Sequence, residues 1–263
     1  MKLTGGEVGL LRVDDARWAD VCAAFTTRMG GVSEGPLSSM NLGFGRGDSP
    51  QNVEENYRRL GQSLGMDPFK AVMTRQVHED TVRCVTQADA GQGLSFPIPP
   101  QGADALVTDC SDLPLIGFWA DCVPILLYDP QRGCVAAVHS GWRGTALKIA
   151  SKTVRTMALQ YHSDPQHILA AIGPSIGPCC YEVGAEVREA MPDFASCFRE
   201  KANGKYMADL WQINRLILLE AGLREENIET AKLCTCCHSE LFFSHRASGG
   251  KRGACAMVIM KQK

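Results

Sequence analysis

The segment VPILLYDPQRGCVAAVHSGWRG, residues 123–144, decides how the middle of this chain folds. It contains two apolar runs, VPILLYD (123–129) and CVAAVHS (134–140), with only the turn sequence DPQRG joining their apolar parts. Apolar runs of this length are typical of buried strands, and so short a connection joins antiparallel neighbours. The segment therefore predicts a β-hairpin, followed from Thr145 by a helix whose apolar residues recur at helical spacing.

Similar patterns continue on both sides of this hairpin. They predict helices over 49–65, capped by Ser49 or Asn52, and over 145–162, 182–191 and 208–222. Strands are expected at 21–27, 71–78, 81–86, 105–109, 113–119, 168–173, 228–234 and 254–260. Such a mixture of hairpins and helices predicts an α+β fold rather than a doubly wound parallel sheet.

The chain has the size and composition of an ordinary globular protein. Its 263 residues are 45% hydrophobic and 21% charged, with a formal net charge of -2. The Gly- and Pro-rich stretch 91–103 is interpreted as a loop rather than a linker, so we expect a single domain over 1–263 with the first ~20 residues peripheral. The lack of excess positive charge argues against nucleic acid and anionic membranes as partners.

The location is inferred from the N-terminus and the cysteines. The first residues lack the apolar block of a secretory signal, and no stretch is long enough to span a membrane. The 12 cysteines include the adjacent pairs Cys179-Cys180 and Cys236-Cys237, which are poorly placed for routine disulfides. We therefore expect reduced thiols and a cytoplasmic protein.

Three residues at predicted strand ends are candidates for chemistry: His78, Cys122 and His139. Two imidazoles and a thiolate suit Zn²⁺, and three protein ligands leave a fourth position open, as in catalytic zinc sites. Alternatively, Cys122 is a thiolate nucleophile activated by a neighbouring imidazolium. A third interpretation is that all three are structural residues, and spacing alone leaves the three alternatives open.

A possible anion site follows the hairpin. If a helix begins at Thr145, its first N–H groups and the Arg143 guanidinium would together suit a phosphate-sized anion. In the alternative interpretation the glycines of GWRG only allow the chain to turn, and Arg143 pairs with a surface carboxylate.

Several long motifs resemble one known family. ADCVPILLYDPQRGCVAAVHSGWRG, AAIGPSIGPCCYEVG and KLCTCCHSELFFSHRASGG are similar to the laccase-domain family of multicopper polyphenol oxidase type, also called YfiH-like proteins. FTTRMGGVSEGPLSSMNLGFGRGD, TRQVHED and ADALVTD extend the resemblance from about residue 25 almost to the C-terminus. Several motifs in the right order make this resemblance specific.

The resemblance implies a four-layer αββα sandwich and a zinc site, with copper as an alternative metal, formed by His78, Cys122 and His139. It also implies phosphorolysis of adenosine, inosine and S-methyl-5'-thioadenosine, together with adenosine deaminase activity. Copper-dependent polyphenol oxidation and peptidoglycan-precursor editing are the alternative activities in the family. The expected partners are a purine nucleoside and phosphate, in a monomer or weak homodimer.

Phosphorolysis requires groups that hold phosphate and a purine. Arg143 and Arg246 are the candidates for phosphate, because a guanidinium binds phosphate in bidentate fashion. Phe242 or Phe243 would stack on the purine, unless this pair is core and Arg246 is a structural anchor. Asn41 is a further candidate for contacting substrate or phosphate.

The sequence CTCCH departs from the family pattern at Cys236, where an aromatic residue is common, and at His238, where an acidic residue is common. Cys234, Cys236, Cys237 and His238 could together hold a second zinc or a copper. Adjacent ligands span a tetrahedron poorly, however, and zinc sites usually use C-x₂-C spacing. We therefore expect this cluster to be mainly structural, with its thiols reduced.

Overall fold

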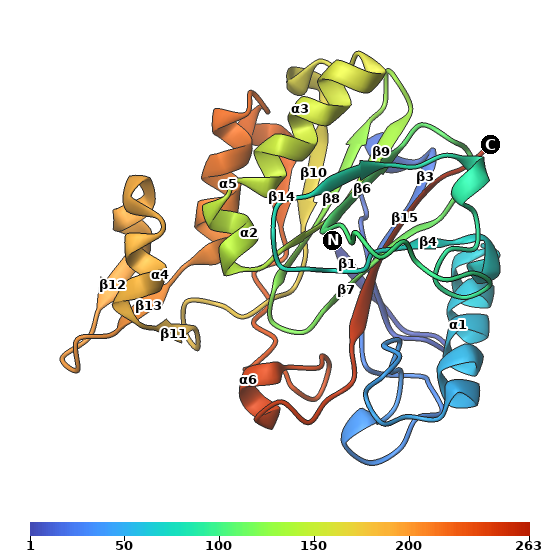
Figure 1. The fold of residues 1–263 in the computed structure, drawn as a ribbon, viewed down its shortest axis with the longest axis horizontal. Helices are drawn as coiled ribbons and strands as arrows, with labels where there is room; N and C mark the ends of the chain where they lie inside the picture. Colours follow the sequence, from blue (N-terminus) through green and yellow to red (C-terminus); the bar gives the residue numbers. More distant parts are fainter.

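In the computed structural model, which describes all 263 residues, two six-stranded sheets pack face to face (Figure 1). The first sheet has the order β1 (Lys2–Thr4), β2 (Leu10–Arg12), β3 (Val21–Thr26), β15 (Cys255–Lys261), β7 (Leu115–Trp119) and β4 (Val72–Met73). The second has the order β14 (Ile228–Thr230), β10 (Leu169–Ile172), β8 (Val123–Asp129), β9 (Cys134–Ser140), β6 (Ala105–Thr108) and β5 (Val82–Cys84).

The hairpin predicted from 123–140 is confirmed. β8 and β9 pair antiparallel in a register that runs from Val123 opposite Ser140 to Asp129 opposite Cys134. At the turn, the Asp129 carboxylate accepts hydrogen bonds from the N–H groups of Gln131 and Arg132. At the other end of the hairpin, the same register brings the residues that flank the two strands to one edge of the sheet.

The core consists of apolar layers on both sides of the second sheet. Along β8, Ile125 and Leu127 face the helices, whereas Leu126 and Tyr128 face the other sheet. Because successive side chains of a strand point to opposite faces, a strand buried on both sides must be apolar throughout. This is why VPILLYD is a continuous apolar run.

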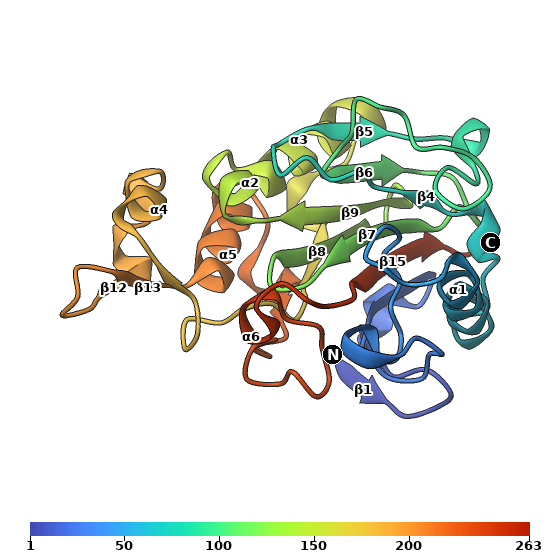
Figure 2. The ribbon, with the colours of Figure 1, turned by 60° about the horizontal axis from the view of Figure 1, so that its bottom comes forward.

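Helices cover the outer faces of the two sheets (Figure 2). The helices α3 (Ile149–Tyr161) and α5 (Leu210–Glu220) pack on the second sheet, and α1 (Pro50–Leu64) contributes to the core on the outer side of the first. α1 begins as expected, because the Ser49 hydroxyl accepts a hydrogen bond from the Asn52 N–H, and it ends at Gly65 with φ 67°. The predicted α+β class is confirmed.

Some predicted elements differ in the structure. The helix expected over 145–162 begins earlier as α2 (Trp142–Ala146) and is interrupted at Lys148, whose φ is 57°. The helix expected over 182–191 is divided by Gly184 into β11 (Glu182–Val183) and α4 (Ala185–Glu189). β11 joins β13 (Tyr206–Ala208) and β12 (Phe198–Glu200) in a small third sheet at one end of the molecule (Figure 1).

The remaining differences are short elements. The strand expected over 71–78 is only Val72–Met73, so residues 74–78 form a loop. β1, β2, β12 and β13 were not predicted, because three-residue strands give too little alternation to detect. α6 (His245–Ser248) is a single turn capped by Ser244. No helix in the structure combines the length and apolar character needed to cross a membrane.

Candidate metal centre

His78, Cys122 and His139 come together at one edge of the second sheet. Cys122 directly precedes β8, His139 is the penultimate residue of β9, and His78 lies in the loop after β4. One potential ligand atom from each lies within 4.8 Å of the other two. The two imidazole rings are 4.9 Å apart between centroids and nearly perpendicular, at 87°. The hairpin register explains why Cys122 and His139 are neighbours, and a separate loop adds His78.

Gly141 leaves room for this cluster. A Cβ atom at position 141 would lie 3.2 Å from Cys122 Sγ, 3.4 Å from His78 Nδ1 and 3.6 Å from His139 Cε1. The first distance is tight for a Cβ atom and the other two are ordinary contacts, so a side chain at position 141 would pack directly against the potential ligand atoms. The glycine in HSGWRG therefore lets the backbone approach the centre closely.

Asp104 orients two of the three candidate ligands. Its fully buried carboxylate accepts a hydrogen bond from His139 Nδ1 at 2.8 Å, which leaves the opposite ring nitrogen, Nε2, free. The same carboxylate accepts the consecutive N–H groups of Val77, His78 and Glu79, each at 3.1 Å. These bonds hold the loop at His78, whose φ of 58° is unusual for a residue other than glycine. A carboxylate behind a ligating histidine is a common outer-shell arrangement in zinc sites.

The electrostatics of the cluster favour a thiolate. Burial raises the pKa of the Cys122 thiol, but the imidazoles of His139 and His78 outweigh this effect and lower the pKa to about 6. Burial lowers the pKa of His139, but Cys122 and Asp104 together raise it to about 9. Thiolate is the form of cysteine that binds metals and also the form that attacks as a nucleophile.

The arrangement suits a metal better than a nucleophile. A nucleophilic cysteine needs one neighbouring imidazole, whereas here two imidazoles from different segments interact with the same sulfur. Two nitrogens and one sulfur are a suitable donor set for Zn²⁺, and the free Nε2 of His139 is available as a ligand atom. The residues present therefore fit the zinc site implied by the resemblance.

Two cavities meet at the centre. One, of about 350 Å³, is lined by His78 and Cys122 together with Arg143, Arg246 and Arg252. The other, of about 330 Å³, is lined by all three candidate ligands together with Phe44, Arg46 and Arg252. The centre therefore borders both cavities, as a catalytic metal would.

The first cavity carries more positive than negative charge, since three arginines and one carboxylate, Asp121, line it. Arg143 stacks on the Trp142 ring at 4.2 Å, and Arg246 donates to the main-chain oxygens of Cys180 and Glu182. Arg252 donates from one terminal nitrogen to the Gly253 oxygen, and its buried Nε has no hydrogen-bond partner. None of the three arginines is paired with a carboxylate, so an anion bound in this cavity would be stabilised.

Comparison with known proteins agrees with the motifs in this site. The family described as multi-copper polyphenol oxidoreductase laccase matches residues 22–262 of the chain. The chain belongs to this laccase family. Among curated family members, purine nucleoside phosphorylase YlmD of Geobacillus stearothermophilus is 39% identical and covers 97% of this chain and 95% of its own length. Purine nucleoside phosphorylase YfiH of Escherichia coli is 38% identical and covers 86% of this chain and 88% of its own length.

A solved structure from the laccase family has the same fold. The crystal structure of YlmD from Geobacillus stearothermophilus superimposes with a TM-score of 0.93, at 37% sequence identity, and covers 99% of both chains. The resemblance noted from the sequence is thus confirmed over nearly the whole chain.

Three binding residues expected in this laccase-family chain are used for structure instead. Asn41 is fully buried, and its amide bonds to Gly43, Asp48 and Ala254, so it has no group free for substrate. Phe242 and Phe243 are both buried in the core between the sheets, which confirms the alternative interpretation of this pair. Neither ring lines the two cavities at the centre.

The helix does not begin at Thr145, where the anion site was expected. α2 begins at Trp142, and Thr145 is buried, with its hydroxyl 2.9 Å from that of Ser140 and 3.2 Å from the Asn214 amide nitrogen. Arg143 nevertheless lines the cavity, and it does not form the ion pair of the alternative interpretation. Arg246 is both a structural anchor and a cavity residue.

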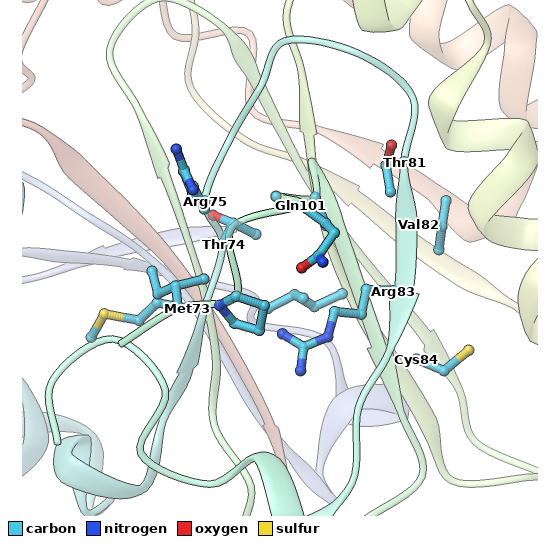
Figure 3. A pocket seen from close by; sticks show the side chains of 13 residues that line it. Met73, Thr74, Arg75, Thr81, Val82, Arg83, Cys84 and Gln101 are labelled. Carbon is cyan, nitrogen blue, oxygen red and sulfur yellow. The ribbon is translucent and has the colours of Figure 1, made fainter. Parts of the chain in front are cut away.

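A larger cavity of the laccase-family chain, about 440 Å³, lies between β5 and the segment 98–103 (Figure 3). Its charged residues are largely occupied: Arg75 donates to the Pro100 oxygen at 2.8 Å, and Arg83 pairs with Asp89. It contains Cys84 but no histidine or carboxylate that could act with it. Its size therefore does not make it the reactive site.

Sequence reasoning missed two functional candidates, Asp104 and Arg252. Asp104 stands directly before a fully apolar strand, ALVT, and an acidic residue in such a position was a usable signal for a buried carboxylate. Arg252, in the segment KRGACAM, had no signal of this kind, because it reaches the cavities only through the position of β15 at the centre of the first sheet.

Proposed function

We propose that this chain is a zinc-dependent purine nucleoside phosphorylase with His78, Cys122 and His139 as metal ligands. The observation that carries the proposal is the position of this N₂S cluster beside a cavity with three unpaired arginines. The names of the relatives support the reaction class, since both YlmD and YfiH are called purine nucleoside phosphorylases. A Zn²⁺ ion bound there would supply Lewis acidity at the junction of the two cavities.

The substrates we propose are phosphate together with adenosine, inosine or S-methyl-5'-thioadenosine. Phosphate would bind among Arg143, Arg246 and Arg252, whose guanidinium groups match its charge and geometry. The purine would lie in the second cavity against Phe44, whose side chain is 44% exposed and therefore accessible for stacking. This arrangement places the ribose between its attacking and leaving groups.

In the proposed reaction, a phosphate oxygen forms a bond to ribose C1′ while the bond from C1′ to the purine breaks. The purine leaves with the electron pair and takes up the proton that hydrogen phosphate loses, so the products are the free base and the 1-phosphate of ribose or of 5-methylthioribose. The arginines would hold the attacking anion close to C1′ and in a fixed orientation. Asp121, the carboxylate in this cavity, accepts hydrogen bonds from the Thr235 hydroxyl and the Arg246 main-chain N–H rather than pairing with a guanidinium group, so the charge of the arginines remains available to phosphate.

Release of hypoxanthine from inosine should depend on phosphate. We expect the purified enzyme to release it only when phosphate is present, with ribose 1-phosphate formed in equal amount, as measured by chromatography. Equal release without phosphate would mean hydrolysis. No release in either case would favour the oxidase or peptidoglycan-editing alternative. With adenosine, formation of inosine rather than adenine would identify the adenosine deaminase activity that the family resemblance implies.

Substitution of Arg143 tests the phosphate position. Arg143→Gln should raise the phosphate KM by roughly 10- to 150-fold with a small effect on nucleoside KM, because one charge-assisted hydrogen bond of about 1.5–3 kcal/mol is lost. Arg188→Gln is the matched control, since Arg188 also stacks on an aromatic ring, Tyr206, but lies outside both cavities. An unchanged phosphate KM together with lower thermal stability would show that Arg143 only supports the turn.

A copper oxidase is less well supported than a phosphorylase. Multinuclear copper sites need several histidines, and the other group of potential ligands in this chain contains only cysteines. Phenol oxidation would therefore require replacement of the metal at the single His78, Cys122 and His139 centre.

A further inference from the structure

Four cysteines gather outside the proposed catalytic centre. Cys179 and Cys180 lie in the turn after β10, and Cys234 and Cys237 lie at the start of the turn after β14. All four sulfur atoms are within 4.8 Å of one another. Cys237 Sγ lies 3.5 Å from Cys179 Sγ and 3.4 Å from Cys180 Sγ. We call these four residues the cysteine cluster.

The cluster differs from the second metal site considered from the sequence. Cys236 is not part of it, and His238 instead directs Nδ1 to Glu240 at 3.2 Å. Their places are taken by Cys179 and Cys180, more than 50 residues earlier in the chain. The remaining pair, Cys234 and Cys237, has the C-x₂-C spacing that is common in zinc sites. Only Cys179 and Cys180 would be adjacent ligands in this cluster.

The spacing of the sulfurs fits one shared metal ion. With Zn–S bonds of about 2.3 Å, the sulfurs of a tetrahedral site are about 3.8 Å apart. Cys237 Sγ lies 3.4 and 3.5 Å from two of the other sulfurs, slightly less than this value, and no two of the four sulfurs are more than 4.8 Å apart. A disulfide requires about 2.05 Å, and it would use only two of the four sulfurs. The geometry therefore favours a metal over a disulfide.

The backbone around the cluster holds the two turns together. Ser175 and Cys234 form a β-bridge, and the Thr235 N–H donates to the Ser175 oxygen at 3.1 Å. The Gly177 N–H donates to Cys234 Sγ at 3.2 Å, the kind of outer-shell bond that stabilises a thiolate ligand. The turns are thus already fixed in the position that brings the sulfurs together, which reduces the entropy lost on binding.

We propose that Cys179, Cys180, Cys234 and Cys237 form a second metal site, a tetrahedral tetrathiolate site for Zn²⁺. Binding would release the thiol protons to solvent, leaving a site of net charge -2 beside the Arg246 guanidinium, which already donates to the Cys180 oxygen. Four protein ligands leave no open position, so the role of this zinc is structural.

The second zinc would fix part of the wall of the first cavity. Tyr181 directly follows Cys180, and the turn that starts at Cys234 leads into His245 and Arg246; all three residues line this cavity. A metal that ties the two turns together would therefore hold the Arg246 side of the phosphate-binding region in place. The site is independent of His78, Cys122 and His139 in its ligands.

Metal content of the full chain tests the proposal. We expect protein purified under reducing conditions to contain two zinc equivalents by elemental analysis, and Cys237→Ser to contain one. Cys236→Ser is the matched control, since Cys236 lies in the same turn outside the cluster, and it should retain two. In cobalt-substituted protein, Cys237→Ser should lose most of the thiolate-to-cobalt charge-transfer absorption, and Cys122→Ala should lose little.

Equal metal content in Cys237→Ser and the wild type would overturn the proposal. Mass spectrometry of unreduced peptides can detect a disulfide from Cys237 to Cys179 or Cys180. Such a disulfide, in protein that contains no cysteine-bound metal, would also overturn the proposal. If Cys237→Ser does not fold, Cys179→Ser at an exposed position allows the same comparison. If the catalytic centre lacks zinc and the cysteine cluster holds it, the wild type would contain one zinc equivalent. The Cys122→Ala variant would keep this equivalent, and Cys237→Ser would lose it.

Discussion

The Cys122→Ala variant is expected to lose one zinc equivalent and nearly all phosphorolysis while remaining folded. Its thiolate is the only sulfur ligand of the proposed centre, and two imidazoles alone bind zinc much more weakly. Outer-shell changes at zinc sites already cost about 10- to 100-fold in affinity or activity, so removal of a ligand should cost more than about 100-fold. Loss of one small, partly buried side chain should cost only about 1 kcal/mol of stability.

Elemental analysis and inosine turnover, measured on the same preparation, check this prediction. Cys84→Ala is the control, because Cys84 is an exposed thiol on β5 that does not line either cavity at the centre. It should keep both metal and activity. Full zinc retention in Cys122→Ala would rule out the proposed ligand set, whereas retained zinc with lost turnover would favour a nucleophilic cysteine.

Asp104→Asn is expected to weaken zinc binding by about 10- to 100-fold and to lower activity at limiting zinc. An amide has one oxygen, so two of the four groups that donate to the Asp104 carboxylate would face an NH₂ group instead. If the NH₂ group replaces Oδ1, the hydrogen bonds from His139 and from the His78 N–H are lost. If it replaces Oδ2, the hydrogen bonds from the N–H groups of Val77 and Glu79 are lost. In both cases buried donors remain unpaired, at a cost of about 1–3 kcal/mol each.

The measurements are a zinc titration with a competing chelator and a thermal unfolding curve. Asp129→Asn is the matched control: Asp129 is equally buried and accepts two N–H groups, but at the opposite end of the β8–β9 hairpin. Both N–H groups bond to Oδ1 of Asp129, so an amide can keep both bonds, and the variant should show unchanged zinc affinity. If Asp104→Asn also leaves the zinc affinity unchanged, the carboxylate does not orient the ligands.

The two variants together separate coordination from orientation. Cys122 contributes a ligand atom, whereas Asp104 positions His139 and the loop at His78 from a buried site without contacting the proposed metal directly. Excess zinc should therefore restore much of the activity of Asp104→Asn and none of that of Cys122→Ala.

The sequence by itself determined the elements whose pattern is local and long. The hairpin over 123–140 and the helix over 49–65 were both predicted, because apolar runs, turn residues and the cap at Ser49 act between near neighbours. The sequence also pointed to His78, Cys122 and His139 as candidate metal ligands, from their residue types at predicted strand ends and from the family motifs. Spacing alone left three interpretations of these residues open.

The tertiary structure decided which distant groups share a site. Asp104 bonds to a histidine 35 residues away, and Cys179 lies against a cysteine 58 residues away. It also assigned Phe243 and Asn41 to the interior, and it brought Arg252 to the cavities by the central position of β15 in its sheet. Local patterns cannot specify such contacts, because they depend on the order and register of strands, which the packing of the whole core fixes.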